Sequence, residues 1–154
     1  MLTMDATPLP VAVEKVNTRY LETLLGYNAR RAALAIIEQF LIEMADYSLR
    51  PVEFSVLSLI AHNPGITSRQ VCSVLGILAP NLVGMLNTLE KRDLIGRHPH
   101  PTDGRAMGLV LTPTGVSTMQ KAEKTASQLE LRQAKNLSAD ERKQLIRLLK
   151  KIYK

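Results

Sequence analysis

The sequence has little of what disulfide-stabilised, aromatic-rich or membrane-spanning proteins contain. It has a single cysteine, Cys72, so no disulfide can form within the chain, which is typical of a reducing compartment. Aromatic residues make up 4% of the chain and tryptophan is absent, so the core must be aliphatic, which favours helices over sheets. No apolar run reaches the roughly 18 residues of a membrane span, and residues 1–10 lack the basic and apolar regions of a signal peptide. We therefore expect a cytoplasmic protein without a membrane partner.

Patterns of catalysis and metal binding are also missing. No nucleophile stands in a recognisable arrangement with a base, and no glycine-rich phosphate loop occurs. His62 stands alone. His98 and His100 share a loop with Asp103, but contact with DNA or solvent explains them better than a metal does. We expect no enzyme activity, no catalytic residue, no metal site and no cofactor.

The sequence does contain a basic charge and a regular apolar spacing. Its formal net charge is +6, which indicates a polyanionic partner. Apolar residues make up 45% of the chain, which fits a single folded domain over residues 1–154.

The apolar spacing predicts six helices. They are expected over Val16–Met44, Pro51–His62, Thr67–Leu75, Pro80–Arg92, Pro113 to about Asn136, and a terminal stretch that opens at Ser138 and includes Ile152. Thr67 and Ser138 each begin a capping box. Between the fourth and fifth helices, Ile95–Arg97 and Met107–Leu111 flank a polar stretch with two prolines, which predicts a β-hairpin.

Three short helices followed by a hairpin make a winged helix-turn-helix. We expect a mainly α fold with a small β-hairpin wing: a DNA-binding core over residues 51–112, flanked by helical dimerisation regions over 13–48 and 113–154. The flanking helices are too apolar for a lone domain. They either pack on each other or intertwine with a second copy of the chain, and we favour the second arrangement. The residues expected at this dimer interface are Leu137, Leu145, Leu148, Leu149 and Ile152.

The second helix of a helix-turn-helix lies in the major groove of DNA, which here is Pro80–Arg92. Its candidate DNA contacts are Pro80, Asn81, Gly84, Met85 and Thr88, with Leu82, Leu86 and Leu89 facing the core. Asn81 can read an adenine edge, and Gly84 lets the helix approach the groove closely.

The preceding helix and the wing offer further contacts. Ser68 and Arg69 can meet a phosphate at a helix N-terminus. The wing candidates are Arg97, His98, Asp103 and Arg105. Arg105 can enter a narrow minor groove, and Asp103 can hold a neighbouring guanidinium through a bidentate pair.

Four segments of this region resemble the MarR family of bacterial regulators. They are Phe54–Leu57, Leu89–Ile95, Asp103–Arg105 and Leu111–Gly115, in the family's order. The resemblance implies an intertwined homodimer that binds palindromic operator DNA and, usually, represses until a ligand releases it. The chain departs from the family at Gly84–Met85, where a Thr-Arg pair is frequent. It also departs at Arg50, where a Ser or Thr cap is common, so we expect that helix to start less firmly.

In the family, ligands generally bind between the long first helix and the DNA-binding domain. The residues of this chain expected to bind a ligand are Arg19, Tyr20, Thr23, Asn28, Arg30 and His62. An arginine with tyrosine and asparagine suits a small aromatic carboxylate, so we expect such an anionic effector, anchored by Arg19 or Arg30. The alternatives are a redox- or metal-responsive regulator of the same fold, and a winged-helix module that binds protein instead of DNA. A buried structural thiol explains Cys72 better than a redox sensor does.

Overall fold

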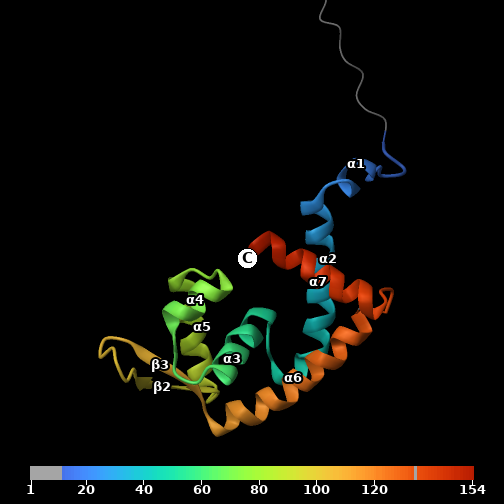
Figure 1. The fold of residues 1–154 in the computed structure, drawn as a ribbon. Coiled ribbons are helices and arrows are strands. Elements are labelled where there is room, and N and C mark those ends of the chain that lie inside the picture. Colours follow the sequence, from blue (N-terminus) through green and yellow to red (C-terminus); the bar gives the residue numbers. More distant parts are fainter. Residues whose placement is uncertain (1–11, 134) are drawn as a thin grey trace, which may run out of the picture. The chain divides into compact units, whose positions relative to one another are not determined.

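The computed structural model describes residues 12–133 and 135–154. Within these residues the chain forms mainly helices, with three short strands (Figure 1). In chain order the elements are α1 (Arg19–Glu22), α2 (Leu25–Glu43), the 3-10 helix η1 (Ala45–Tyr47), α3 (Pro51–His62), β1 (Ile66–Thr67), α4 (Ser68–Leu75), α5 (Ala79–Lys91), β2 (Ile95–Pro99), β3 (Met107–Leu111), α6 (Pro113–Gln133) and α7 (Ala139–Tyr153). The chain divides into two compact units, residues 1–35 and 36–154.

The first unit contains a break that the apolar spacing did not predict. Instead of one helix from Val16, the chain forms the short α1 and then α2, separated by Thr23 and Leu24. The side-chain amide of Asn28 donates to the carbonyls of Glu22 and Leu24 at 2.9 and 2.8 Å. Such side-chain bonds offer the backbone an alternative to helical hydrogen bonds. The apolar pattern therefore continues across a point where the helix does not.

The core of the second unit joins α3, α5, the sheet and α6. Leu57 and Ile60 of α3 are fully buried, and Leu82, Leu86 and Leu89 of α5 are buried as predicted. Because these leucines recur at helical spacing, they turn one face of α5 inward and the opposite face outward. In the described ranges no single helix is long and apolar enough to cross a membrane. Helices α4 and α5 have the required length and apolar composition only when they are counted together, and the chain bends by 117° between them.

At the start of helix α3, Glu53 bonds back to the residue that precedes the helix. The Glu53 carboxylate accepts hydrogen bonds from the backbone N–H of Arg50 at 2.9 Å and from the Arg50 guanidinium at 3.3 Å. An acidic residue at the third helical position satisfies the backbone donor before the helix whatever the N-cap side chain is. The Arg50 side chain itself makes no capping hydrogen bond, as expected, so the bonds of Glu53 supply only half of a capping box.

The wing belongs to a three-stranded antiparallel sheet in the order β1-β3-β2. Strands β2 and β3 form the predicted hairpin, with Ile95 opposite Leu111, and β2 continues to Pro99. Strand β1 pairs with the other side of β3, where Ile66 lies opposite Leu109. A strand this short shows no alternating pattern, so the sequence did not predict it.

The wing is tied to the end of α5 and the start of α6 at one junction. The backbone N–H of Thr112 donates to the Leu94 carbonyl at 3.1 Å, and the Thr112 hydroxyl donates to the Asp93 carbonyl. The same hydroxyl oxygen accepts from the N–H of Gly115 at 3.0 Å, and the Thr114 hydroxyl donates to the Asp93 carboxylate at 3.1 Å. The three elements therefore share one hydrogen-bonded corner.

Helix α7 leaves an apolar face uncovered. It begins directly after Ser138, at the predicted capping box, in which the backbone N–H of Glu141 donates to the Ser138 hydroxyl at 3.1 Å. The preceding helix α6 ends at Gln133, before the predicted end at Asn136. None of the residues of α7 is buried. The uncovered apolar side chains near and along it include all five of the predicted interface, each at least 39% exposed: Leu137, Leu145, Leu148, Leu149 and Ile152.

Candidate DNA-binding surface

Helix α5 presents a continuous exposed face on the side away from the core. The predicted contacts Pro80, Asn81, Gly84 and Thr88 are all exposed. A Cβ added at Gly84 would meet no atom within 4 Å, so a groove can approach the backbone closely there. Met85 is half-buried and packs against the core, so it lies at the edge of this face, and its contact with DNA stays a prediction.

Two further exposed residues of α5, Val83 and Asn87, were missed by the sequence interpretation. Asn87 lies three residues after Gly84, which itself lies four residues after Pro80, so all three share one stripe of the helix. The spacing from Pro80 and Gly84 is the signal that identifies Asn87, which the prediction passed over although it included the neighbouring Thr88.

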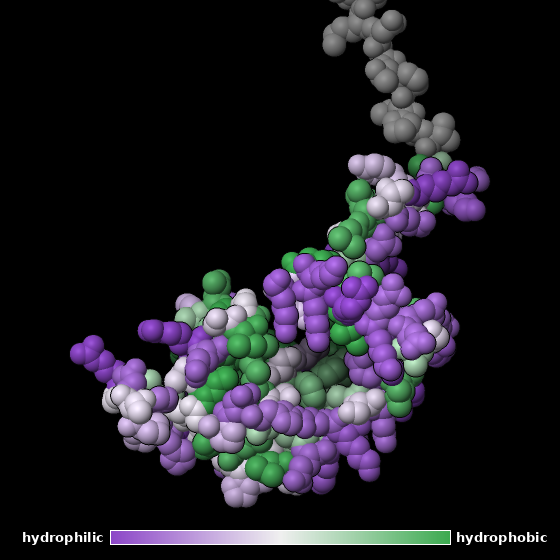
Figure 2. Space-filling view, in the orientation of Figure 1, coloured by the Kyte–Doolittle hydropathy of each residue, from purple (hydrophilic) through white to green (hydrophobic). Residues whose placement is uncertain are grey.

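A hollow lies between the start of α4 and the wing. It is lined by the candidates Ser68, Arg69, Arg97, Asp103 and Arg105, together with Thr67, Ala106 and Met107. Hydrophilic side chains project from the β2–β3 hairpin (Figure 2). The fold therefore brings candidates from two separately predicted elements onto one surface, where three arginines face a single carboxylate. Such a basic surface suits a phosphate backbone.

The first turn of α4 is held by its predicted capping box. The backbone N–H of Gln70 donates to the Thr67 hydroxyl at 3.3 Å, and the Gln70 side-chain oxygen accepts from the N–H of Thr67 at 2.9 Å. The first N–H groups of a helix have no partner within it. In α4 they belong to Ser68 and Arg69, beside the hollow, where the helix dipole favours an anion.

At the tip of the wing, side chains bond mainly to the backbone, and the Thr102 hydroxyl also lies 3.2 Å from His100 Nδ1. Asp103 Oδ1 accepts from the backbone N–H of Arg105 at 3.0 Å, so the predicted pairing of Asp103 with a guanidinium is replaced by a turn contact. His100 Nδ1 accepts from the N–H groups of Thr102 and Asp103, each at 3.3 Å, which places the proton of the neutral ring on Nε2. Arg105, in this turn, and His98, in β2, are both exposed to solvent.

Arg97 is turned toward α5. Its Nη2 donates to Asn87 Oδ1 at 2.8 Å, and its Nε lies 3.3 Å from Glu90 Oε2. That Nε is buried without a hydrogen-bond partner, so the contact with Glu90 is an attraction between charges and not an aligned hydrogen bond. The Arg97 side chain is 29% exposed. Most of it is therefore engaged within the protein, whereas Arg105 is exposed, and contact of Arg97 with DNA stays a prediction.

The predicted effector residues belong to different units. Five of the six lie in the first unit, where all are exposed: Arg19, Tyr20, Thr23, Asn28 and Arg30. His62 belongs to the second unit, where its Nε2 lies 2.9 Å from Glu123 Oε1 of α6. Within residues 12–133 and 135–154 no three His, Cys, Asp or Glu side chains are grouped to hold a metal. Cys72 is half-buried and packs against the core.

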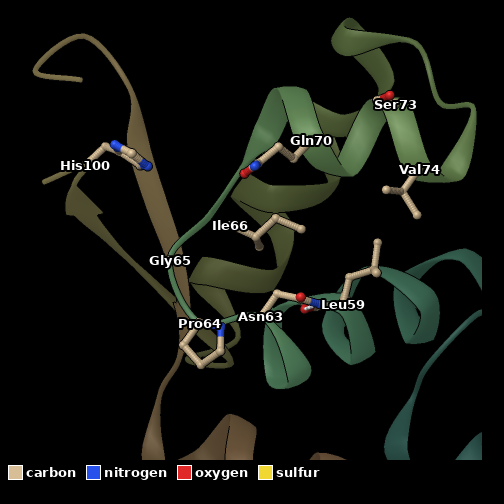
Figure 3. Close-up of a pocket in the computed structure, with 9 residues that line it drawn as sticks. All are labelled: Leu59, Asn63, Pro64, Gly65, Ile66, Gln70, Ser73, Val74 and His100. Atoms are coloured by element: carbon tan, nitrogen blue, oxygen red, sulfur yellow. Dashed lines mark hydrogen bonds between the residues drawn. The ribbon is translucent and has the colours of Figure 1, made fainter. Parts of the chain in front are cut away.

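A second hollow of this unit lies beside α4 (Figure 3). Its lining residues are Leu59, Asn63, Pro64, Gly65, Ile66, Gln70, Ser73, Val74 and His100. Figure 3 shows Leu59 and Val74 pointing toward each other, with Gln70 and His100 away from them. No predicted effector residue lines this hollow.

Comparison with known proteins finds regulators of one family. The model of the MarR family matches residues 47–106. The "Putative transcriptional regulatory protein for hcr operon" of Thauera aromatica is 31% identical over 131 residues, 84% of this chain and 79% of that protein. The transcriptional repressor CouR, solved bound to a 23-mer DNA duplex, is 39% identical with a TM-score of 0.86, over 92% of this chain and 100% of that chain. CouR bound to p-coumaroyl-CoA is 38% identical with a TM-score of 0.80, over 91% and 97%.

Proposed function

The chain belongs to the MarR family of winged helix-turn-helix transcriptional regulators, and from this we propose that it is a homodimeric repressor of a palindromic operator that an aromatic effector releases. The observation that carries the DNA-binding part is the surface shared by the exposed face of α5, the first turn of α4 and the wing. CouR, a repressor of similar sequence and fold, binds a DNA duplex. A regulator of this kind acts where the DNA is, so we place it in the cytoplasm.

In this proposal α5 enters the major groove and the wing reaches the minor groove beside it. The exposed side chains of α5 from Pro80 to Thr88 carry no charge. Arg69 and Arg105 are exposed at the edges of the surface, where they supply attraction to phosphates that does not depend on sequence. Binding is therefore expected to weaken steeply as salt is added.

The uncovered apolar face of α7 supports the dimer. Leu145 and Leu149 lie on one side of this helix and remain exposed in the single chain. Large exposed apolar patches usually mark interaction sites, and a second copy of the chain is the occupant that a palindromic operator requires. We expect the two half-sites to lie about one helical turn apart, near 10 base pairs.

The effector we propose is an aromatic acid or its coenzyme A thioester. CouR, 38% identical to this chain, is solved with p-coumaroyl-CoA, which combines an aromatic ring with an anionic group. The net charge of +6 favours an anion, and Arg19 and Arg30 of the first unit are exposed and available to bind one. In the thioester the carboxylate is replaced by a neutral thioester group, and the negative charge lies on the phosphates of coenzyme A, so this ligand departs from the expected free carboxylate.

The test is a titration of the purified protein on DNA upstream of its own gene, with hydroxycinnamic acids and their coenzyme A thioesters added in separate arms. Tight, salt-sensitive binding that one arm abolishes supports both parts of the proposal and names the ligand class. Tight binding that neither arm disturbs retains the operator function and refutes the effector. If binding equals that to random DNA, selection of a preferred duplex from a random library decides whether an operator lies elsewhere or the DNA-binding function fails.

A further inference from the structure

We propose that Asn87 reads one base of each operator half-site and that Arg97 fixes which side of the Asn87 amide faces the DNA. This inference rests on the DNA-binding function proposed above. Asn87 is exposed on the stripe of α5 that also carries Pro80 and Gly84, opposite the leucines that face the core. It therefore lies on the face of the recognition helix that a major groove would meet.

The orientation of the Asn87 amide follows from the chemistry of its partner. A guanidinium only donates hydrogen bonds, so the Asn87 atom that lies 2.8 Å from Arg97 Nη2 is the carbonyl oxygen Oδ1. Arg97 is itself restrained, because its backbone belongs to β2 and its Nε lies 3.3 Å from Glu90 Oε2. The oxygen is thereby held toward the wing, which leaves the two donors of the NH₂ group available to a base.

This arrangement changes which base the side chain prefers. An unrestrained asparagine reads adenine with both atoms, since Oδ1 accepts from N6 while Nδ2 donates to N7. With Oδ1 turned toward Arg97, Asn87 presents its NH₂ donors to the DNA. Guanine presents two acceptors in the major groove, N7 and O6, whereas adenine presents one acceptor and one donor. We therefore expect guanine at the position that Asn87 contacts, and Arg97 acts as a positioning residue.

The experiment is selection from a random duplex library followed by binding titrations, with the wild-type protein and variants whose folding is checked by thermal unfolding. Asn87→Ala should lose the guanine preference at one position per half-site and bind the selected operator about 3- to 10-fold more weakly, the worth of a hydrogen bond or two. Asn87→Asp keeps the acceptor for Arg97 but loses the donors, so its preference should move toward cytosine. Arg97→Met releases Oδ1, so the preference should move toward adenine. Glu90→Gln removes the charge of Glu90 but keeps an oxygen acceptor for Arg97 Nε, so the Arg97–Asn87 hydrogen bond should persist and the preferred base should remain unchanged.

Two results would overturn the inference while the proposed function stands. If Asn87→Ala and Asn87→Asp select the wild-type operator unchanged, Asn87 reads no base. If Arg97→Met weakens binding equally for every sequence and lowers the slope of log K against log[salt] by about 0.9, Arg97 contacts a phosphate and positions nothing. A wild-type protein that selects no sequence would instead refute the DNA-binding function itself.

Discussion

The packing leaves no room for a side chain at Gly115, which makes Gly115→Ala a sharp test of the wing junction. An added Cβ would lie 2.0 Å from the Leu94 carbonyl oxygen and 3.0 Å from its carbon. That carbonyl cannot withdraw freely, because it accepts the backbone N–H of Thr112 at 3.1 Å. The alanine therefore has to push the end of α5 away from the start of α6.

The magnitude follows from two opposing effects. Overpacking costs about 1–3 kcal/mol, and contact with backbone places this case near the upper end. Alanine regains about 1 kcal/mol of helix propensity over glycine, which leaves a net loss of about 2 kcal/mol in the free energy of unfolding. For a chain of this size we expect the melting temperature to fall by about 4–8 °C. Thermal and denaturant unfolding at one fixed protein concentration measure this loss, because the stability of a dimer depends on concentration.

Gly84→Ala is the matched control. Gly84 also lies in a helix, but its added Cβ would meet nothing within 4 Å, so the variant should gain up to about 1 kcal/mol. If Gly84→Ala gains stability while Gly115→Ala melts no lower than the wild-type protein, the close approach of Gly115 to Leu94 is refuted.

Three further changes test the surfaces described above. Arg105→Ala should weaken operator binding by about 1–3 kcal/mol in a fluorescence anisotropy titration, and an equal loss on all sequences would show that it meets only phosphate. Leu145→Asp combined with Leu149→Asp should give monomers by light scattering after size exclusion, whereas Lys143→Asp should remain dimeric; a dimeric double variant would refute the α7 interface. Thr67→Ala should lower the free energy of unfolding by about 1 kcal/mol in urea, since it removes the hydroxyl that caps α4, and unchanged stability would mean that the capping box contributes nothing.

The elements that the sequence predicted well are those whose signals lie within a few residues. The capping boxes at Thr67 and Ser138 fixed the starts of α4 and α7, and the leucine spacing fixed the inward face of α5. The failures have local and non-local causes. The break at Thr23 depends on hydrogen bonds that the apolar pattern does not report, and β1 exists only because β3 lies beside it.

The two wing arginines show why the site was harder to predict than the fold. In the sequence, Arg97 and Arg105 are equivalent basic residues of one hairpin. In the structure, Arg97 bonds to Asn87 across the packing of β2 on α5, while Arg105 is exposed near the tip. Only these tertiary contacts distinguish an arginine that positions another side chain, the role proposed for Arg97, from one that is free to contact DNA directly, the role proposed for Arg105. The sequence alone gives the residue type of Asn87 and its position in the helix. Its proposed role depends on the hydrogen bond with Arg97, which only the structure shows.

These placements separate affinity from specificity in the proposed complex. Phosphate attraction comes from exposed arginines at the edges of the surface, Arg69 and Arg105, and it acts on any duplex. The middle of α5 is uncharged, so discrimination between sequences falls to a few neutral contacts, each a small part of the binding free energy. An amide held by Arg97 discriminates better than a free one, because rotating it to suit the wrong base would break a charge-assisted hydrogen bond. A recognition helix without an arginine can therefore still read sequence, provided that its neutral side chains are fixed from the wing.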